Sequence, residues 1–223
     1  MNVLIACEES QAVCKAFREL GHEAYSCDIQ ECSGGRPGWH IRGDVLPLIN
    51  GRCEFETMDG QKHSIDGKWD LLIAHPPCTY LTNAGAVRMR VKGEIQPERF
   101  KKAMEAKEFF MACYNADCDH IAVENPTPMK IVGLPPYSQA IQPYWFGHPY
   151  SKRTCLWLKG LPPLFPTECL SWHEPYVNGG CKDAHGNYRK FQGRKERDQK
   201  TRSKTFPGIA KAMAEQWGGF EEK

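Results

Sequence analysis

Residues 69–81 read Trp69-Asp70-Leu71-Leu72-Ile73-Ala74-His75-Pro76-Pro77-Cys78-Thr79-Tyr80-Leu81. The short apolar run from Leu71 to Ala74 is typical of a strand that is buried on both faces of a parallel sheet. Pro76 and Pro77 cannot continue a central strand, because neither has an N–H to donate. The chain therefore leaves the sheet at its carboxyl edge, where open α/β sheets bind their ligands, and it delivers Cys78 there. The ordinary alternative for a free cysteine is a buried, unreactive side chain.

The chain has 223 residues, enough for one domain or for one domain with a modest appendage. Its net charge of +2 is nearly neutral and gives no global argument for a nucleic-acid partner. Lys and Arg are concentrated in residues 188–204. Such a run can face phosphates, and it can equally be a solvated basic face.

Eleven cysteines are present, which is a high count. The sequence begins with an apolar run and no basic leader, and no later apolar run approaches the length of a membrane span. We therefore expect a cytoplasmic protein without membrane association, whose thiols are reduced. The cysteines are then expected to serve packing, catalysis or metal binding, and not a disulfide framework.

The first thirty residues are typical of the start of a nucleotide-binding α/β unit. Val3–Cys7 is predicted to be a strand, and residues 12–20 a helix with Ser10 as its N-cap. A second strand, Glu23–Cys27, ends at Asp28, where a carboxylate can bind ribose hydroxyls. The usual glycines are missing from the first turn, so an ordinary βαβ start with a surface aspartate stays an alternative.

A second acid and a second proline-ended strand follow. Asp44 lies at the end of a short element, and residues 50–68 are predicted to form a small hairpin or loop. The basic segment Thr82–Gly93 is expected to be a mobile loop beside the site, and Pro97 fits the first turn of a helix. The strand His120–Val123 ends at Glu124. Because parallel strands end at the same edge, Cys78 and Glu124 are expected to meet there.

The last third of the chain is predicted to contain two strands, at residues 142–146 and 154–158, with Lys152 and Arg153 in the turn between them. A helix is expected from Pro207 to Trp217.

The order of these motifs resembles that of the DNA (cytosine-5)-methyltransferase family. The resemblance extends from residue 2 to about 160, with a weaker similarity at 203–217. The motifs that carry the resemblance are Gly43-Asp44-Val45, Pro77-Cys78, Asn83-Ala84-Gly85, Val123-Glu124-Asn125-Pro126 and Lys152-Arg153-Thr154-Cys155-Leu156.

The resemblance implies a Rossmann-like, S-adenosylmethionine-dependent methyltransferase fold, with a mostly parallel sheet flanked by helices. We expect residues 1–160 to form the catalytic core and residues 161–203 a short variable or recognition segment. Residues 204–223 would then form a C-terminal helix that packs back on the core.

The resemblance also assigns catalytic roles to Cys78, Glu124 and Arg153. A thiolate that adds to cytosine C6 makes C5 able to attack a methyl donor, which calls for a cysteine of lowered pKa. Cys78 is that candidate, with Arg153 as its cationic neighbour. Glu124 is the candidate for a carboxylic acid of raised pKa at cytosine N3, Asn125 would hold the loop, and Arg153 or Lys152 would hold O2 and the carboxylate.

The cofactor implied by the resemblance is S-adenosylmethionine, lying across the strand ends. Asp28 would bind its ribose hydroxyls, Ile29 the adenine face, and Asp44 the adenine amino group. Pro76 would border the methyl group. The residues expected to face its methionine part are Ala6, Cys7, Glu8 and Ser10.

Three departures from the family pattern stand out. The first turn, Ile5-Ala6-Cys7-Glu8-Glu9-Ser10, has no glycine, and the glutamine expected before Arg153 is absent. The segment before the last helix is also too short for a full target-recognition domain. We therefore expect a DNA partner whose sequence is read weakly, over a short site, or with the help of a partner protein. Duplex, single strand and free nucleotide all stay open as substrates.

Two other interpretations remain. Pro76-Pro77 followed by Cys78-Thr79-Tyr80 is also similar to the loop of amino-methyltransferases that modify N4 of cytosine or N6 of adenine, although His75 and Cys78 replace that family's usual residues. The pairs Cys169/His173 and Cys181/His185 are zinc-type ligands in a non-standard spacing. A zinc ion on them could stabilise a small nucleic-acid-binding segment in a protein that is not an enzyme. No metal site is included in our main interpretation.

Overall fold

The structure is a computed structural model that describes residues 1–177, 179–182, 188–191 and 199–219, with the backbone alone for 179–182, 188–191 and 199–200. The helices are α1 (Ala12–Glu19), α2 (Pro97–Tyr114), α3 (Gln199–Ser203) and α4 (Pro207–Trp217). The strands of the main sheet are β1 (Asn2–Ala6), β2 (Glu23–Asp28), β3 (His40–Arg42), β6 (Leu71–Ala74), β9 (Ile121–Pro126), β10 (Gln139–Ile141) and β12 (Thr154–Lys159). Among these residues, no helix combines the length and the apolar character that crossing a membrane requires.

The main sheet has the order β10-β12-β9-β6-β1-β2-β3. The strands from β3 to β9 pair in parallel, whereas β12 runs antiparallel to both β9 and β10. The chain therefore forms the Rossmann-like, mostly parallel sheet that the sequence predicts, with one reversed strand inserted near an edge.

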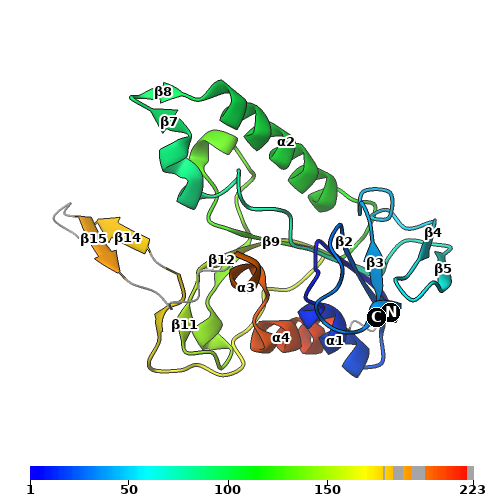
Figure 1. The fold of residues 1–223 in the computed structure, drawn as a ribbon. Coiled ribbons are helices and arrows are strands. Elements are labelled where there is room, and N and C mark those ends of the chain that lie inside the picture. The colour runs from blue at the N-terminus through cyan, green and yellow to red at the C-terminus, as the bar shows by residue number, and fades with distance from the viewer. Residues whose placement is uncertain (178, 183–187, 192–198, 220–223) are drawn as a thin grey trace.

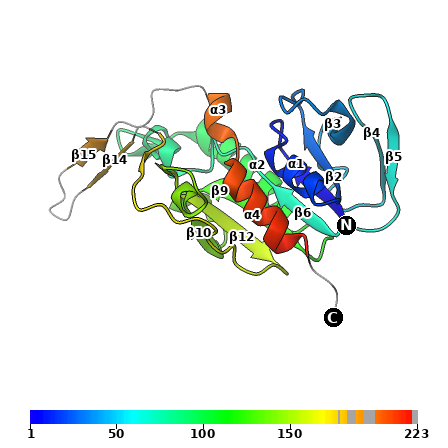
Figure 2. The same cartoon turned by 90° about the horizontal axis from the view of Figure 1, so that it is seen from below.

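Helices cover both faces of the sheet (Figures 1 and 2). Side chains alternate along β1: Val3 and Ile5 pack with α1 and α4, and Leu4 packs in the cluster that includes α2. Since both faces are covered, β1 and β6 are apolar along almost their whole length, as central parallel strands must be.

The strand register brings four chain segments to one edge. Ala6 at the end of β1 pairs with Ala74 at the end of β6, and Ala74 also pairs with Val123 of β9. The antiparallel pairing of Pro126 with Thr154 places the start of β12 at this same edge. Residues 7–10, 75–78, 124–126 and 152–153 therefore converge, although they are far apart in the sequence.

Helix α1 begins differently from the prediction. Gln11, not Ser10, occupies the N-cap, and it has a left-handed φ of 57° and no side-chain capping bond. The Glu8 carboxylate replaces the missing cap by accepting hydrogen bonds from the N–H groups of Val13 (2.7 Å) and Cys14 (3.2 Å). An acid upstream of the turn thus satisfies the free donors of the first helical turn.

The predicted strand at residues 142–146 is wrong. Pro143–Trp145 is a 3₁₀ turn, and the strand β10 lies just before it, because Pro143 has no N–H for a ladder. The hairpin expected in 50–68 is confirmed as β4 (Cys53–Glu56) and β5 (Lys62–Ile65), and helix α4 has the predicted bounds. The remaining short strands are β7 (Arg90–Val91), β8 (Glu94–Ile95), β11 (Tyr150–Ser151), β13 (Glu174–Pro175), β14 (Gly179–Lys182) and β15 (Tyr188–Phe191).

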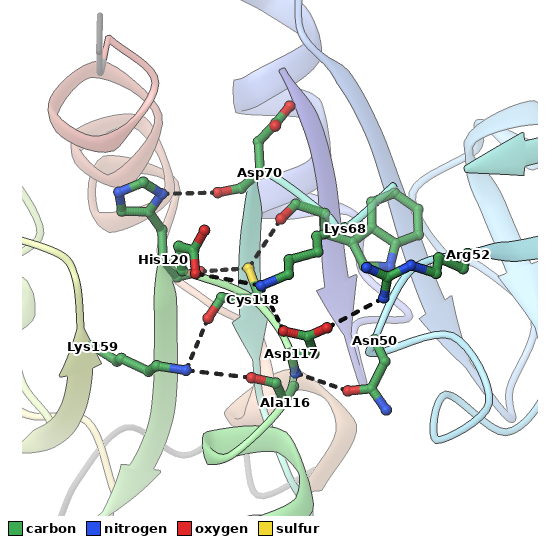
Figure 3. A network of polar contacts seen from close by, with 11 residues as sticks. Asn50, Arg52, Lys68, Asp70, Ala116, Asp117, Cys118, His120 and Lys159 are labelled. Carbon is green, nitrogen blue, oxygen red and sulfur yellow. Dashed lines mark hydrogen bonds and ion pairs between the residues drawn. The ribbon is translucent and has the colours of Figure 1, made fainter. Parts of the chain in front are cut away.

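A polar network connects residues at the opposite edge of the sheet, where the parallel strands begin (Figure 3). Asp117 pairs with Lys68 (2.6 Å) and Arg52 (3.2 Å), and its N–H donates to the side chain of Asn50. His120, just before β9, contacts the carbonyl of Asp70, just before β6. These exposed ion pairs each stabilise little in water, but together they fix the amino ends of the two strands that carry Cys78 and Glu124 at their other ends.

Candidate active site

A pocket of about 260 Å³ lies at the carboxyl edge of the sheet. Its walls come from the β1–α1 turn, the ends of β2, β6 and β9, the turn before β12, and residues 202–205 at the end of α3 and just after it. Of the residues given a role from the sequence, those that line this pocket are Cys7, Glu8, Ser10, Asp28, Pro76, Cys78, Glu124, Asn125 and Lys152.

Four of the singled-out residues do not line the pocket. Ala6 is completely buried at the end of β1, below the turn. Ile29 is 76% exposed beside Asp28, and Asp44 is exposed and accepts a hydrogen bond from the N–H of Leu46. Arg153 is exposed, and it donates to the hydroxyl of Tyr137 at 2.7 Å.

The loop that carries Cys78 is held from two sides. Asn125, at the end of β9, donates from Nδ2 to the carbonyl of Pro76 at 2.9 Å, as expected of a residue that holds this loop. On the other side, Arg99 of α2 donates to the carbonyl of Thr79 and lies over the ring of Tyr80. Arg99 could not be predicted from the sequence, because nothing local in an arginine on a helix indicates a contact to a distant loop.

The Cys78 thiol is half-buried, and its pKa is raised, not lowered as the sequence reasoning expects. Burial is the main cause, and the negative charge of Glu124 adds to it. Lys152 and Arg202 act in the opposite direction. In the free protein, Cys78 is therefore a protonated thiol with cations already beside it.

Glu124 forms a buried pair with His75, whose Nδ1 lies 2.9 Å from the Glu124 carboxylate. Burial alone would raise the pKa of Glu124, but the hydrogen bond and charge of His75, together with Lys152, lower it overall. The expected raised pKa of Glu124 is therefore corrected to a lowered one. His75 was visible in the sequence as the residue between β6 and the prolines, but its partner lies 49 residues away.

Lys152 is one of the cations that line the pocket, whereas its neighbour Arg153 lies outside it. Lys152 donates from Nζ to the carbonyl of Arg202 at 2.8 Å, which fixes the end of α3 over the pocket. Lys204 follows in the same wall and donates to the hydroxyl of Ser33 at 3.1 Å. Arg202 and Lys204 come from the end of the basic stretch, whose composition is the only signal that could have pointed to them.

The β1–α1 turn takes its shape without glycine. Cys7 and Gln11 adopt positive φ angles of 60° and 57°, conformations that glycine would adopt more easily. Gly34 from the neighbouring loop packs so closely that an added Cβ would lie 2.6 Å from Gln11 and from the carbonyl of Ser10. Two hydrogen bonds between Gln11 and the backbone of Arg36 hold the two segments together. The turn therefore keeps its shape without glycines, because Gly34 and Arg36 of the neighbouring loop pack against it and bond to it.

Charges of both signs line the pocket. Glu8, Glu9, Asp28 and Glu124 follow or end strands β1, β2 and β9, Lys152 lies in the turn before β12, and Arg202 and Lys204 lie at the end of α3 and just after it. Burial raises the pKa of Glu8, against the effects of His75 and the helix N–H groups. Burial also raises the pKa of Cys7 well above its ordinary value, so Cys7 is a neutral lining thiol.

The zinc alternative falls partly outside the described residues, since those exclude His185 and the side chain of Cys181. Cys169 is exposed, and the ring of His173 stacks on Tyr144 with ring centroids 3.9 Å apart. Within the described part of the chain, no group of three or more metal-ligating side chains is present.

Comparisons with known proteins give a distant likeness to solved structures. No family model and no curated protein matches the sequence. Among solved structures, one from E. coli, described as a candidate DNA modification methyltransferase encoded within a prophage, is 12% identical with a TM-score of 0.44. The match covers 76% of this chain and 52% of that one, so the chain spans about half the length of that structure.

Proposed function

We propose that this protein transfers a methyl group from S-adenosylmethionine to C5 of cytosine in DNA, with Cys78 as the covalent nucleophile. The observation that carries the proposal is the convergence of Cys78, Glu124 and Lys152 on one pocket. A thiol, a carboxylate and a cation are the three groups that nucleophilic activation of a pyrimidine ring requires.

The donor set of the pocket fits the proposed cofactor. S-adenosylmethionine carries a sulfonium and an ammonium group, which suit the carboxylates of Glu8 and Glu9. Asp28 lines the pocket at the end of β2, where a carboxylate can accept from ribose hydroxyls. When bound, the cofactor supplies an electrophilic methyl group. Asp44, Ile29 and Ala6 lie outside this pocket, which therefore supports cofactor contacts for Asp28 and Glu8 and not for these three residues.

In the proposed reaction, the Cys78 thiolate adds to cytosine C6. A bond forms between the sulfur and C6, and an electron pair moves onto C5 and N3. Lys152 would stabilise negative charge on the ring and on the thiolate, because it lines the pocket and lowers the pKa of Cys78. The sequence assigned this role first to Arg153. Once C5 has been methylated, which would leave S-adenosylhomocysteine, the C5 proton would pass to solvent and the sulfur–C6 bond would break, which would release 5-methylcytosine and restore Cys78.

The raised pKa of Cys78 links its activation to substrate binding. The ionised Glu124 carboxylate is one cause of that raised pKa. When Glu124 shares a proton with N3 of a bound cytosine, its negative charge is neutralised, and the thiolate then forms more easily. The free protein would thus keep Cys78 unreactive until a base occupies the pocket.

The proposed polymer is DNA, reached by flipping the base out of the stack. Arg202 and Lys204 also line the pocket, and their positive charge would attract phosphates. Residues 161–203 would supply recognition, and their shortness supports weak or partner-assisted reading of sequence.

A methyl-transfer assay tests this function. Purified protein is incubated with methyl-labelled cofactor and, separately, duplex DNA, single-stranded DNA, RNA and cytosine nucleotides. We expect label in 5-methylcytosine after digestion of DNA to nucleosides, and none with Cys78→Ala. Label on N4 of cytosine or N6 of adenine would replace the proposal by amino-methylation, and no transfer to any substrate would contradict it.

A further inference from the structure

His75 lines the pocket and forms a close pair with Glu124. Its Nδ1 is 2.9 Å from the Glu124 carboxylate, and the two side chains are only 11% and 14% exposed. The other ring nitrogen, Nε2, is buried and has no hydrogen-bond partner among the described residues. A nearly buried imidazole with this geometry is held in place by Glu124.

Charged groups act on the His75 ring from three elements. Glu124 at the end of β9 is the hydrogen-bond partner, and Glu8 acts from the turn between β1 and α1. Lys152 acts from the turn before β12 with the opposite sign. Two carboxylates against one ammonium group leave an environment that favours a positively charged ring.

We propose that His75 is a positioning residue that orients Glu124 and keeps on its own ring the proton that the base later requires. The pair Glu124–His75, flanked by Glu8, would therefore act as one unit that holds a single dissociable proton. This inference rests on the proposed function for the use of that proton, and on the geometry alone for its location.

A proton on His75 reconciles two requirements of the site: a proton for cytosine N3 and an ionised Glu124. Attack at C6 requires a proton at cytosine N3, but Glu124 is held as a carboxylate in the free protein. Burial opposes charge on His75, but the hydrogen bond and charge of Glu124, together with Glu8, outweigh it and raise the pKa of the ring. The proton is therefore present in the site, one residue further from the base.

The proposed proton movements balance. As the sulfur–C6 bond forms, one proton passes from the pair through Glu124 to N3, which leaves a neutral His75 and an ionised Glu124. When the sulfur–C6 bond breaks, N3 returns its proton to the pair. The thiol proton of Cys78 and, later, the C5 proton pass to solvent, and the released Cys78 thiolate regains a proton from solvent, so no oxidant or reductant is needed.

The first test is an NMR titration of the histidine rings, which does not depend on methyl transfer. In the wild-type protein we expect His75 to stay protonated above the ordinary imidazole range, and to titrate at least about one pH unit lower in Glu124→Gln. His40 is the internal control, because it is buried between Ser26 and the carbonyl of Gln30, and burial lowers its pKa. The His75 signal is identified by its loss in His75→Gln, and unchanged signals from the other histidines report that each variant is folded.

A smaller downward shift of His75 is expected in Glu8→Gln. If His75 titrates like His40 in the wild-type protein, or identically in wild type and Glu124→Gln, the proposal is overturned, whether or not the protein methylates DNA. The failure of this inference and the failure of the proposed function are thus distinguishable.

The second test is the pH dependence of adduct formation in His75→Gln. With the imidazole removed, the proton must reside on Glu124. The high-pH limb of the rate profile, where this proton is lost and adduct formation slows, should therefore move to lower pH by about one unit or more. A structural role for His75 would lower the rate equally at every pH and leave that limb in place, and this result would overturn the proposal.

Discussion

Asn125 donates a hydrogen bond from Nδ2 to the carbonyl oxygen of Pro76 at 2.9 Å. The bond joins the strand end that carries Glu124 to the loop that carries Cys78, two segments separated by 49 residues in sequence. Asn125 is 1% exposed, so the bond is shielded from water. The position of the thiol relative to the acid therefore depends directly on one buried amide.

Replacing this amide should loosen the Cys78 loop. In Asn125→Ala we expect the free energy of unfolding to fall by about 1–2 kcal/mol, because the Pro76 carbonyl loses its donor in a buried place. Adduct formation at Cys78 should slow as well. Denaturant unfolding and trapping on a fluorinated substrate measure the two effects. Asn50→Ala is the matched control: Asn50 accepts from Asp117 at the opposite edge, so only stability should change, and a parallel loss of adduct in this control would contradict the assignment.

Lys152 and Arg153 can be separated by the same neutral substitution. Lys152→Met should slow adduct formation by about tenfold or more, because the ring loses the cation that we propose stabilises its negative charge. Arg153→Met should have a much smaller effect, since its guanidinium is bound to Tyr137 outside the pocket. Single-turnover rates on cytosine-containing DNA decide the matter. A larger loss in Arg153→Met would restore the role first assigned to Arg153.

Cys78 should become more reactive when Glu124 loses its charge. The pKa of Cys78 is raised by burial and by Glu124 and lowered by Lys152. The pH at which alkylation of Cys78 becomes fast should therefore fall in Glu124→Gln and rise in Lys152→Met. Iodoacetamide labelling, read at the Cys78 peptide by mass spectrometry across a pH series, measures this. Equal curves for the three proteins would contradict the electrostatic account.

The carboxyl edge itself was predictable from sequence. Apolar runs that stop at polar residues and prolines, as at His75-Pro76-Pro77 and Glu124-Asn125-Pro126, are local signals, and parallel pairing brings their ends together. Pairs across the site were not predictable. His75 and Glu124 meet through the register of two strands, and the choice between Lys152 and Arg153 depends on Tyr137. The pKa directions of Cys78 and Glu124 depend on burial and on these partners, so their sign could not be read from residue type.

The contact between Gly34 and the β1–α1 turn provides a separate prediction. Gly34→Ala should weaken cofactor binding by about tenfold, because its Cβ would lie 2.6 Å from Gln11 and the Ser10 carbonyl and push on the turn. Isothermal titration with S-adenosylmethionine measures the affinity. Gly67→Ala is the matched control, since an added Cβ there meets nothing within 4 Å. Equal affinities in the two variants would show that the turn does not form part of the cofactor site.

The central claim is that Cys78 bonds to C6 of a cytosine, and covalent trapping tests it most directly. DNA that contains 5-fluorocytosine blocks the final proton loss, so the enzyme should stop as a covalent complex when S-adenosylmethionine is present. Intact mass spectrometry should show a methylated protein–DNA adduct, mapped to the Cys78 peptide and absent in Cys78→Ala. Methylation without any adduct, or an adduct that persists in Cys78→Ala, would contradict the account.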